Sequence, residues 1–354
     1  MLGIRLFLCS IVFLWLVPYS ILQASPPVDV ELNQVVTKSQ TEVEILEFGP
    51  WQLVMDVAWS PDGELLVVSA GDWLYIYQTE KYQPISKLRI GALTHSITFS
   101  PDGNRLAAGS RDGHIRIWKI ENMIKPNEDD SVFPYLDIDA HQKGVTSITF
   151  DPSGRLLASA GYDAIVHIWD TESGETVSDL IGGTYAVPGI SFNSDGRFLA
   201  ILNGEVIRLR ELETGRIWGT LRSPTWLYSI AIDPNTGLLA AGDISGNIHL
   251  WDPDDAYRTG KETYPEPVTL SIITDSEDGY QTLIWNVAFH SDESILAAAS
   301  GDSMIYLWDT ASGELLEVWA GHTAGVTSLS FSPDGQFLAS GSLDSTLRIW
   351  SVDP

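Results

Sequence analysis

Residues 321–351 read GHTAGVTSLSFSPDGQFLASGSLDSTLRIWS, and this stretch decides the fold. Two short β-prone runs flank the turn Ser332-Pro333-Asp334-Gly335, and a third run ends at Trp350. Proline fixes φ at the first central position of such a turn, and glycine supplies the positive φ that the turn requires. The stretch therefore predicts three antiparallel strands joined by tight turns.

The same pattern recurs along the chain, seven copies in all. Further exact or looser copies of the turn occupy residues 60–63, 100–103, 151–154, 193–196, 233–237 and 290–293. Each third run ends on a large residue: Tyr77, Trp118, Trp169, Leu209, Trp251, Trp308 and Trp350. The repeat length is about 41 residues, with insertions near 121–139 and 253–282. Repetition at this period is typical of arrays and propellers, in which one repeat forms one structural unit.

These residues resemble the WD-repeat family, whose repeat carries Gly-His early and Trp-Asp late. Gly321-His322, Trp169-Asp170, Trp251-Asp252 and Trp308-Asp309 match these signatures directly. The resemblance covers residues 41–354. It implies an all-β, seven-bladed β-propeller in which each repeat forms a four-stranded blade around a central channel.

The two ends of the repeat region predict how the ring closes. The last repeat stops shortly after Trp350, so its blade lacks a fourth strand. Residues 41–48 read as an isolated strand with alternating apolar and acidic side chains. Pairing of this N-terminal strand into the last blade would remove an exposed sheet edge. Residues 25–40, which contain Pro26-Pro27, read as a linker.

Composition narrows the classes of function. The 354 residues carry a net charge of −27 at pH 7, and such a chain repels phosphate backbones, so we expect no nucleic-acid partner. Cys9 is the only cysteine, which excludes a disulfide framework and a cysteine-based zinc site. No phosphate loop or metalloprotease motif occurs, and we expect neither a cofactor nor a metal.

The N-terminal segment reads as a targeting sequence. Arg5 precedes a continuous apolar run that begins at Leu6, and Pro18 interrupts it. Residues 1–24 therefore resemble a secretory signal peptide, and an uncleaved membrane anchor through residues 6–24 is the alternative. Both interpretations place the propeller outside the cell membrane, either secreted, periplasmic or anchored.

Two sets of residues share the same offsets: His141, Ser159, Asp163 and Trp169, and His322, Ser340, Asp344 and Trp350. A His, Ser and Asp combination raises the possibility of a hydrolase triad. In the family that the chain resembles, such a set forms a buried hydrogen-bond chain within one blade. The set occurs twice, whereas a catalytic site usually occurs once. We therefore interpret both sets as structural networks and predict no catalytic residue.

The resemblance also indicates where a partner would bind. In WD-repeat propellers, partners dock on the face around the channel entrance, where first strands begin and where the turns before the third strands lie. Aligning the repeats places these residues at such positions: Trp226, Tyr228, Trp285, Ile244, Tyr162, Arg111, His95 and Leu343. Exposed aromatic side chains are characteristic of binding hot spots. We predict that Trp226, Tyr228 and Trp285 share one patch.

Together these features predict a noncatalytic, monomeric scaffold outside the cell membrane that binds a protein or peptide. Two alternatives remain open at this point. One is a propeller hydrolase with carboxylates at the central channel, and the other is a protein that binds a glycan or another polar ligand through the same aromatic residues.

Overall fold

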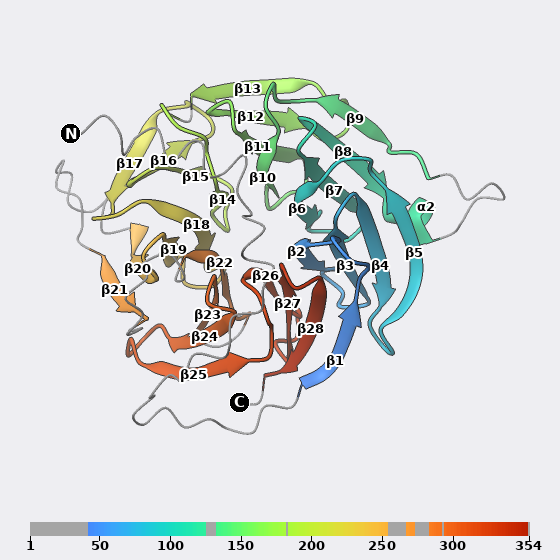
Figure 1. Cartoon of the computed structure of the whole chain (residues 1–354). Coiled ribbons are helices and arrows are strands. Elements are labelled where there is room, and N and C mark those ends of the chain that lie inside the picture. The colour runs from blue at the N-terminus through green and yellow to red at the C-terminus, as the bar shows by residue number, and fades with distance from the viewer. Residues whose placement is uncertain are drawn as a thin grey trace, which may run out of the picture. The chain divides into compact units, whose positions relative to one another are not determined.

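The computed structural model describes residues 42–124, 132–181, 183–253, 267–272, 283–291 and 294–352. Within these ranges the chain forms seven antiparallel sheets of four strands each. Figure 1 shows the sheets as blades in a ring, each with its first strand nearest the centre. The all-β, seven-bladed β-propeller expected from the repeats is confirmed.

The strands follow the repeats in order. Blade 1 contains β2 (Val54–Trp59), β3 (Leu65–Ala70), β4 (Trp73–Gln78) and β5 (Gln83–Arg89). Blade 2 contains β6 (Thr94–Phe99), β7 (Arg105–Ser110), β8 (His114–Lys119) and β9 (Leu136–Asp139), with helix α2 (Ile120–Ile124) after β8. Blade 3 contains β10 (Val145–Phe150), β11 (Leu156–Gly161), β12 (Ile165–Asp170) and β13 (Thr176–Ile181).

The remaining blades repeat this order. Blade 4 contains β14 (Ile190–Phe192), β15 (Phe198–Asn203), β16 (Val206–Glu211) and β17 (Ile217–Arg222). Blade 5 contains β18 (Leu227–Ile232), β19 (Leu239–Asp243), β20 (Asn247–Trp251) and β21 (Val268–Ser271). Blade 6 contains β22 (Ile284–Phe289), β23 (Ile295–Ser300), β24 (Met304–Asp309) and β25 (Leu315–Ala320). Blade 7 contains β26 (Val326–Phe331), β27 (Phe337–Ser342), β28 (Thr346–Ser351) and β1 (Glu42–Glu47).

Blade 7 combines strands from both ends of the described chain. β1 pairs antiparallel with β28, with Glu44 opposite Ile349 and Glu47 opposite Thr346. The backbone nitrogen of Phe48 donates to the carbonyl oxygen of Ser345 at 3.0 Å and extends this contact. Because β1 leads directly into β2 of blade 1, the pairing joins the last blade to the first.

The hydrophobic core lies between neighbouring blades. One apolar cluster combines Val54 and Leu66 of blade 1 with Leu347 of blade 7, and all three are fully buried. The second strands carry small residues because the faces of adjacent blades approach closely. A Cβ atom at Gly109 of β7 would lie only 2.5 Å from Cγ1 of Val145 in the next blade, so the packing there requires glycine.

Polar side chains of the first strands join several consecutive blades near the centre of the ring. In four places a side-chain oxygen on one first strand accepts from a backbone nitrogen on the next. The acceptors and donors are Asp56 Oδ2 and Ile97 (2.7 Å), Ser96 Oγ and Ile148 (3.2 Å), Asn286 Oδ1 and Leu329 (3.2 Å), and Ser328 Oγ and Val57 (3.2 Å). Each bond crosses from one blade to its neighbour and satisfies a partly or fully buried amide. We refer to these four acceptor residues as the inner belt.

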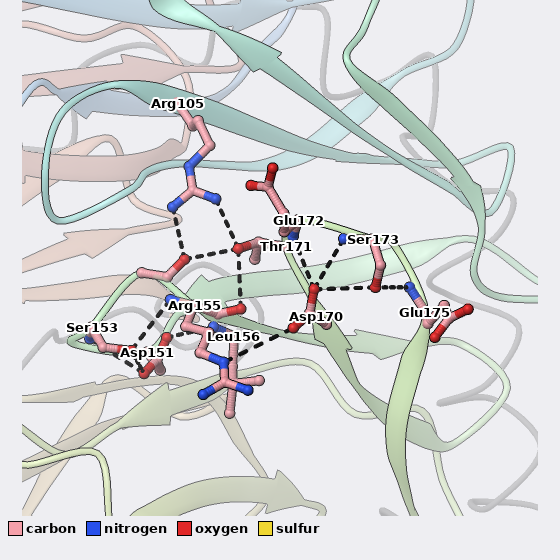
Figure 2. Close-up of polar contacts among 11 residues, drawn as sticks. Arg105, Asp151, Ser153, Arg155, Leu156, Asp170, Thr171, Glu172, Ser173 and Glu175 are labelled. Atoms are coloured by element: carbon pink, nitrogen blue, oxygen red, sulfur yellow. Dashed lines mark hydrogen bonds and ion pairs between the residues drawn. The ribbon is translucent and has the colours of Figure 1, made fainter.

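A further contact joins blades 2 and 3 on the face that carries the turns between first and second strands. Figure 2 shows Arg105 of β7 reaching into blade 3, where its Nη1 donates to Thr171 Oγ1 at 2.8 Å and its Nη2 to the Gly154 carbonyl at 2.9 Å. The guanidinium also lies 5.7 Å from the centroid of the Phe150 ring. Repeat alignment did not predict this contact, because Arg105 stands where the other blades carry an apolar residue.

Candidate functional site

The predicted partner-binding residues lie on one face of the propeller, which we call the entrance face. Some of these residues lie at the start of a first strand and others in the turn before a third strand, and backbone hydrogen bonds connect the two kinds of position. In four blades, a backbone nitrogen in the turn before the third strand donates to a carbonyl just before the first strand. The donor and acceptor pairs are Arg111 and Leu93, Tyr162 and Gly144, Ile244 and Trp226, and Leu343 and Gly325. Since these carbonyls belong to residues just before the first strands, the two sets predicted from the sequence are neighbours in space.

Aromatic rings on this face pair across blades. Tyr228 of blade 5 meets Trp285 of blade 6 edge to face, with ring centroids 5.3 Å apart. Tyr162 of blade 3 meets His95 of blade 2 in the same manner at 6.0 Å. All four side chains are half-buried, so each pair still presents surface to solvent. Edge-to-face rings form a firm apolar surface with few rotatable bonds.

Trp226 lies differently from the prediction that it shares one patch with Tyr228 and Trp285. Its ring contacts Tyr185 of the loop before β14, with centroids 4.8 Å apart, and so turns toward blade 4. Ile244, beside it, is 38% exposed. The repeat pattern does not predict a role for Tyr185, because the next residue, Ala186, occupies the position in blade 4 that corresponds to Trp226 in blade 5. The bond from Asn203 Nδ2 to the Tyr185 carbonyl, at 2.8 Å, fixes this loop.

Arg111 stands beside the His95–Tyr162 pair, because its backbone nitrogen donates to the carbonyl of Leu93, two residues before His95. Burial, together with the nearby Arg111 cation, lowers the pKa of His95 to about 4. Burial raises the pKa of Tyr162, and Arg111 opposes this rise. Burial likewise raises the pKa of Tyr228, and the electrostatic effect of Tyr162 raises it further. We call His95, Arg111, Tyr162, Tyr228 and Trp285 the central cluster.

At neutral pH the central cluster therefore holds neutral rings beside one cation. The imidazole of His95 is unprotonated and the two phenols keep their protons, since pH 7 lies above the first pKa and below the other two. Leu343 of blade 7 is half-buried on the same face.

The two polar sets form matching hydrogen-bond chains. In blade 3, His141 Nδ1 lies 2.9 Å from Asp163 Oδ1 and His141 Nε2 lies 2.8 Å from Ser159 Oγ. Trp169 Nε1 donates to the same Ser159 oxygen at 2.9 Å. Burial lowers the pKa of His141 against the opposing effect of Asp163, so the imidazole is neutral and its Nε2 accepts the serine proton.

Blade 7 repeats this geometry. His322 Nδ1 lies 2.9 Å from Asp344 Oδ2, and His322 Nε2 lies 2.7 Å from Ser340 Oγ. Trp350 Nε1 donates to Ser340 Oγ at 2.8 Å. Burial acts to raise the pKa of Asp344, but the hydrogen bond from His322 and further donors outweigh it and hold the pKa well below its usual range.

Both serines are poorly placed for nucleophilic attack. Ser159 and Ser340 are 0% exposed, and each hydroxyl already contacts a histidine and a tryptophan. A substrate would have to open the blade to reach either oxygen. This geometry supports the interpretation of the sets as internal braces rather than triads.

Blade 5 builds a comparable network from other positions. Asp243 Oδ2 contacts His249 Nε2 at 3.0 Å and accepts from Thr225 Oγ1 at 2.5 Å, and both imidazole and carboxylate are buried. Burial acts to raise the pKa of Asp243, but the hydrogen bonds from His249 and its other partners lower it to about 2. Sequence comparison missed this network because Ser245 stands at the usual aspartate position and Asp243 precedes it by two residues.

No group of three or more histidine, cysteine or acidic side chains within the described ranges is arranged to hold a metal ion.

Comparison with known proteins identifies the fold family. The sequence model of the WD domain, G-beta repeat family matches six stretches, residues 44–74, 91–119, 134–170, 215–252, 272–309 and 313–351, which together cover more than half of the chain. The chain belongs to the WD-repeat family. No match falls between residues 170 and 215, the stretch that contains β14, β15 and β16 and in which Leu209 replaces the usual tryptophan.

Three relatives illustrate the range of WD-repeat proteins that the chain resembles. It is 26% identical to a periodic tryptophan protein 2 homolog of Dictyostelium discoideum over 84% of this chain and 31% of the relative. It is 27% identical to nuclear distribution protein PAC1 of Arthroderma benhamiae over 61% of this chain and 37% of the relative. It is 24% identical to target of rapamycin complex subunit wat1 of Schizosaccharomyces pombe over 84% and 78%, respectively. The chain thus spans about a third of the length of the first two relatives. Propellers of the WD-repeat family bind protein partners.

The comparisons correct one prediction. The expected location outside the cell membrane is wrong, because two of these relatives are named for nuclear distribution and for the target of rapamycin complex, and none of the three for secretion or membrane anchoring. The expected signal peptide at residues 1–24, the alternative anchor through residues 6–24 and the linker at residues 25–40 lie outside the described residues. In the part of the chain that the structure describes, no helix has the length and apolar character needed to cross a membrane.

Proposed function

We propose that this propeller is a noncatalytic scaffold that binds a protein or peptide segment on its entrance face. The observation that carries the proposal is the half-buried Tyr228–Trp285 pair, which bridges blades 5 and 6 at 5.3 Å. Aromatic rings with few rotatable bonds lose little conformational freedom on binding and are typical anchors of protein interfaces. WD-repeat relatives in complexes, such as the target of rapamycin complex subunit, support a scaffold role.

A third aromatic pair, Trp226 and Tyr185, extends the proposed surface toward blade 4. Trp226 and Tyr185 are half-buried and lie beside the exposed Ile244. We propose that His95, Arg111, Tyr162 and Leu343 complete the binding face. The two His-Ser-Asp-Trp sets would brace blades 3 and 7 without contacting the partner.

Affinity capture followed by a binding measurement tests this function. The full chain is immobilised, partners are recovered from a cell lysate, and the affinity of each purified partner is measured against single variants. Trp285→Ala should weaken binding about 30-fold or more, corresponding to about 2 kcal/mol at a hot spot. Trp218→Ala provides the control, because Trp218 lies on the outer strand β17 and stacks on Phe198 at 5.1 Å.

A partner whose affinity is unaffected by Trp285→Ala, Tyr228→Ala and Trp226→Ala would contradict the proposal. Circular dichroism and the unfolding midpoint of each variant separate loss of binding from loss of fold.

A further inference from the structure

Arg111 is an exposed cation that lacks an acidic partner in a strongly acidic protein. The adjacent carboxylate of Asp112 accepts from Arg116 Nη2 at 2.8 Å, and Arg116 Nε also lies 3.4 Å from Asp137 Oδ2. Among the described residues, no carboxylate lies within ion-pair distance of the Arg111 guanidinium. Asp112 is thus already engaged, and the charge of Arg111 remains available on the entrance face.

Two other exposed cations of the propeller are compensated. Arg89 pairs with Asp72 at 3.0 Å and Arg197 with Asp195 at 2.7 Å. Arg111 instead stands beside the edge-to-face pair of His95 and Tyr162, since its backbone nitrogen bonds to Leu93 just before His95. Both rings are neutral at pH 7. A cation beside neutral, half-buried rings forms a stronger ion pair than one surrounded by water, because the rings displace solvent from the contact.

We propose that the central cluster binds a peptide segment that places an Asp or Glu carboxylate on Arg111 and an adjacent apolar side chain on Tyr228 and Trp285. This inference rests on the proposed function and adds the chemical class of the partner. The guanidinium matches a carboxylate with paired donors, and the aromatic pair supplies the apolar surface. A basic segment would set its own cation against Arg111. The net charge of −27 repels an acidic segment at long range, but salt at physiological concentration screens that repulsion. The contact between the carboxylate and Arg111 is short-range and is screened less.

Selection from a phage-displayed library of random dodecapeptides tests the inference. The full chain serves as bait at physiological salt, and the recovered peptides are synthesised with a fluorescent label for anisotropy measurements. We expect enrichment of peptides with an Asp or Glu beside a large apolar residue. For such a peptide, Arg111→Ala should weaken binding about tenfold and Arg111→Glu still more, as expected for loss of a charge-assisted hydrogen bond.

Arg155→Ala is the matched control. Its side chain is 80% exposed at a turn on the opposite face, so the substitution makes the same change in net charge away from the central cluster. The same peptide with its carboxylate replaced by the amide should bind wild type and Arg111→Ala with equal affinity. The Arg111→Ala substitution and the change of carboxylate to amide would then be non-additive, which identifies a direct contact between Arg111 and the peptide carboxylate.

The outcomes separate the two claims. Peptides without acidic residues that bind through Trp285 and ignore Arg111→Ala would overturn this inference and leave the proposed function standing. Peptides or partners that ignore every substitution on the entrance face would overturn the proposed function. An empty selection, or acidic peptides equally weakened by Arg155→Ala, also counts against the inference.

Discussion

Asp56 is the one carboxylate of the inner belt, and its replacement by Asn should make the propeller more stable at neutral pH. Its Oδ2 accepts from the backbone nitrogen of Ile97 at 2.7 Å, and its Oδ1 accepts from Ser328 Oγ at 2.6 Å and from the nitrogen of Val57 at 2.9 Å. Burial raises the pKa of Asp56 from 3.8 to about 6 despite these hydrogen bonds. The folded state therefore favours the protonated carboxyl.

The sign of the pH dependence follows from this rise. A carboxyl whose pKa is higher in the folded than in the unfolded state binds its proton more tightly when folded. Its ionisation therefore lowers the free energy of unfolding as the pH rises from about 4 through 6, and the full penalty is present at pH 7. A difference of about 2 pKa units corresponds to at most about 3 kcal/mol. Because the Asp56 side chain is half-buried, solvent reduces this figure, and we expect about 1–2 kcal/mol.

Asparagine can take over most of the hydrogen bonds. Asn286 in blade 6 already uses its Oδ1 to accept from the nitrogen of Leu329 at 3.2 Å, as Asp56 does from Ile97. The new amide group would donate to Ser328 Oγ, and the nitrogen of Val57 retains its bond to that same oxygen at 3.2 Å. The cost of rearrangement should stay below about 1 kcal/mol.

Urea unfolding of wild type and Asp56→Asn between pH 4 and 8 measures the effect. The variant should be more stable by about 1 kcal/mol at pH 7, and its advantage should disappear near pH 4, where both side chains are uncharged. The mirror substitution Asn286→Asp should lose stability as the pH rises over the same range. An Asp56→Asn variant that is less stable at pH 7, or whose difference from wild type is independent of pH, would refute the reasoning.

Two further predictions concern the braces and the closure of the ring. Ser340→Ala leaves Trp350 Nε1 and His322 Nε2 without their common partner, so it should lower the free energy of unfolding by about 1–3 kcal/mol, whereas Ser294→Ala at an exposed turn should not. A Ser340→Ala variant with unchanged stability would show that the brace contributes nothing. Deleting residues 1–48 removes β1 from β28 and should lower the melting temperature or cause aggregation, while deleting residues 1–38 should leave both unchanged. Equal melting temperatures for the two truncations would mean that β1 is dispensable.

The positions of strands followed from the sequence because the turns set the phase of every repeat. The runs from Val145 to Phe150 and from Leu156 to Ala160, on either side of one turn, correspond to β10 and β11. The repeat phase also placed Tyr228 and Trp285 at entrance positions of adjacent blades, where the rings meet at 5.3 Å. Both results depend only on backbone periodicity.

Side-chain partners were harder to predict because they depend on neighbouring loops. Trp226 turns toward Tyr185, which lies in the loop before β14 and one residue before the entrance position of blade 4. Asp243 and His249 make a network from positions that the other repeats do not use. The location was wrongly predicted for a different reason, since it rested on residues 1–24 alone, which the propeller repeats do not constrain.

The braces and the entrance face are linked through the backbone. Tyr162 directly precedes Asp163, whose carboxylate is held by His141 and also accepts from the nitrogen of Gln142 at 3.1 Å. Leu343 precedes Asp344 in the same way, and Ile244 follows Asp243. In each turn a buried carboxylate fixes the residue beside it, whose side chain lies on the entrance face. A binding surface held in this manner loses little entropy when a partner docks, because its rings are already ordered before contact. The polar networks would thus serve recognition without touching the partner.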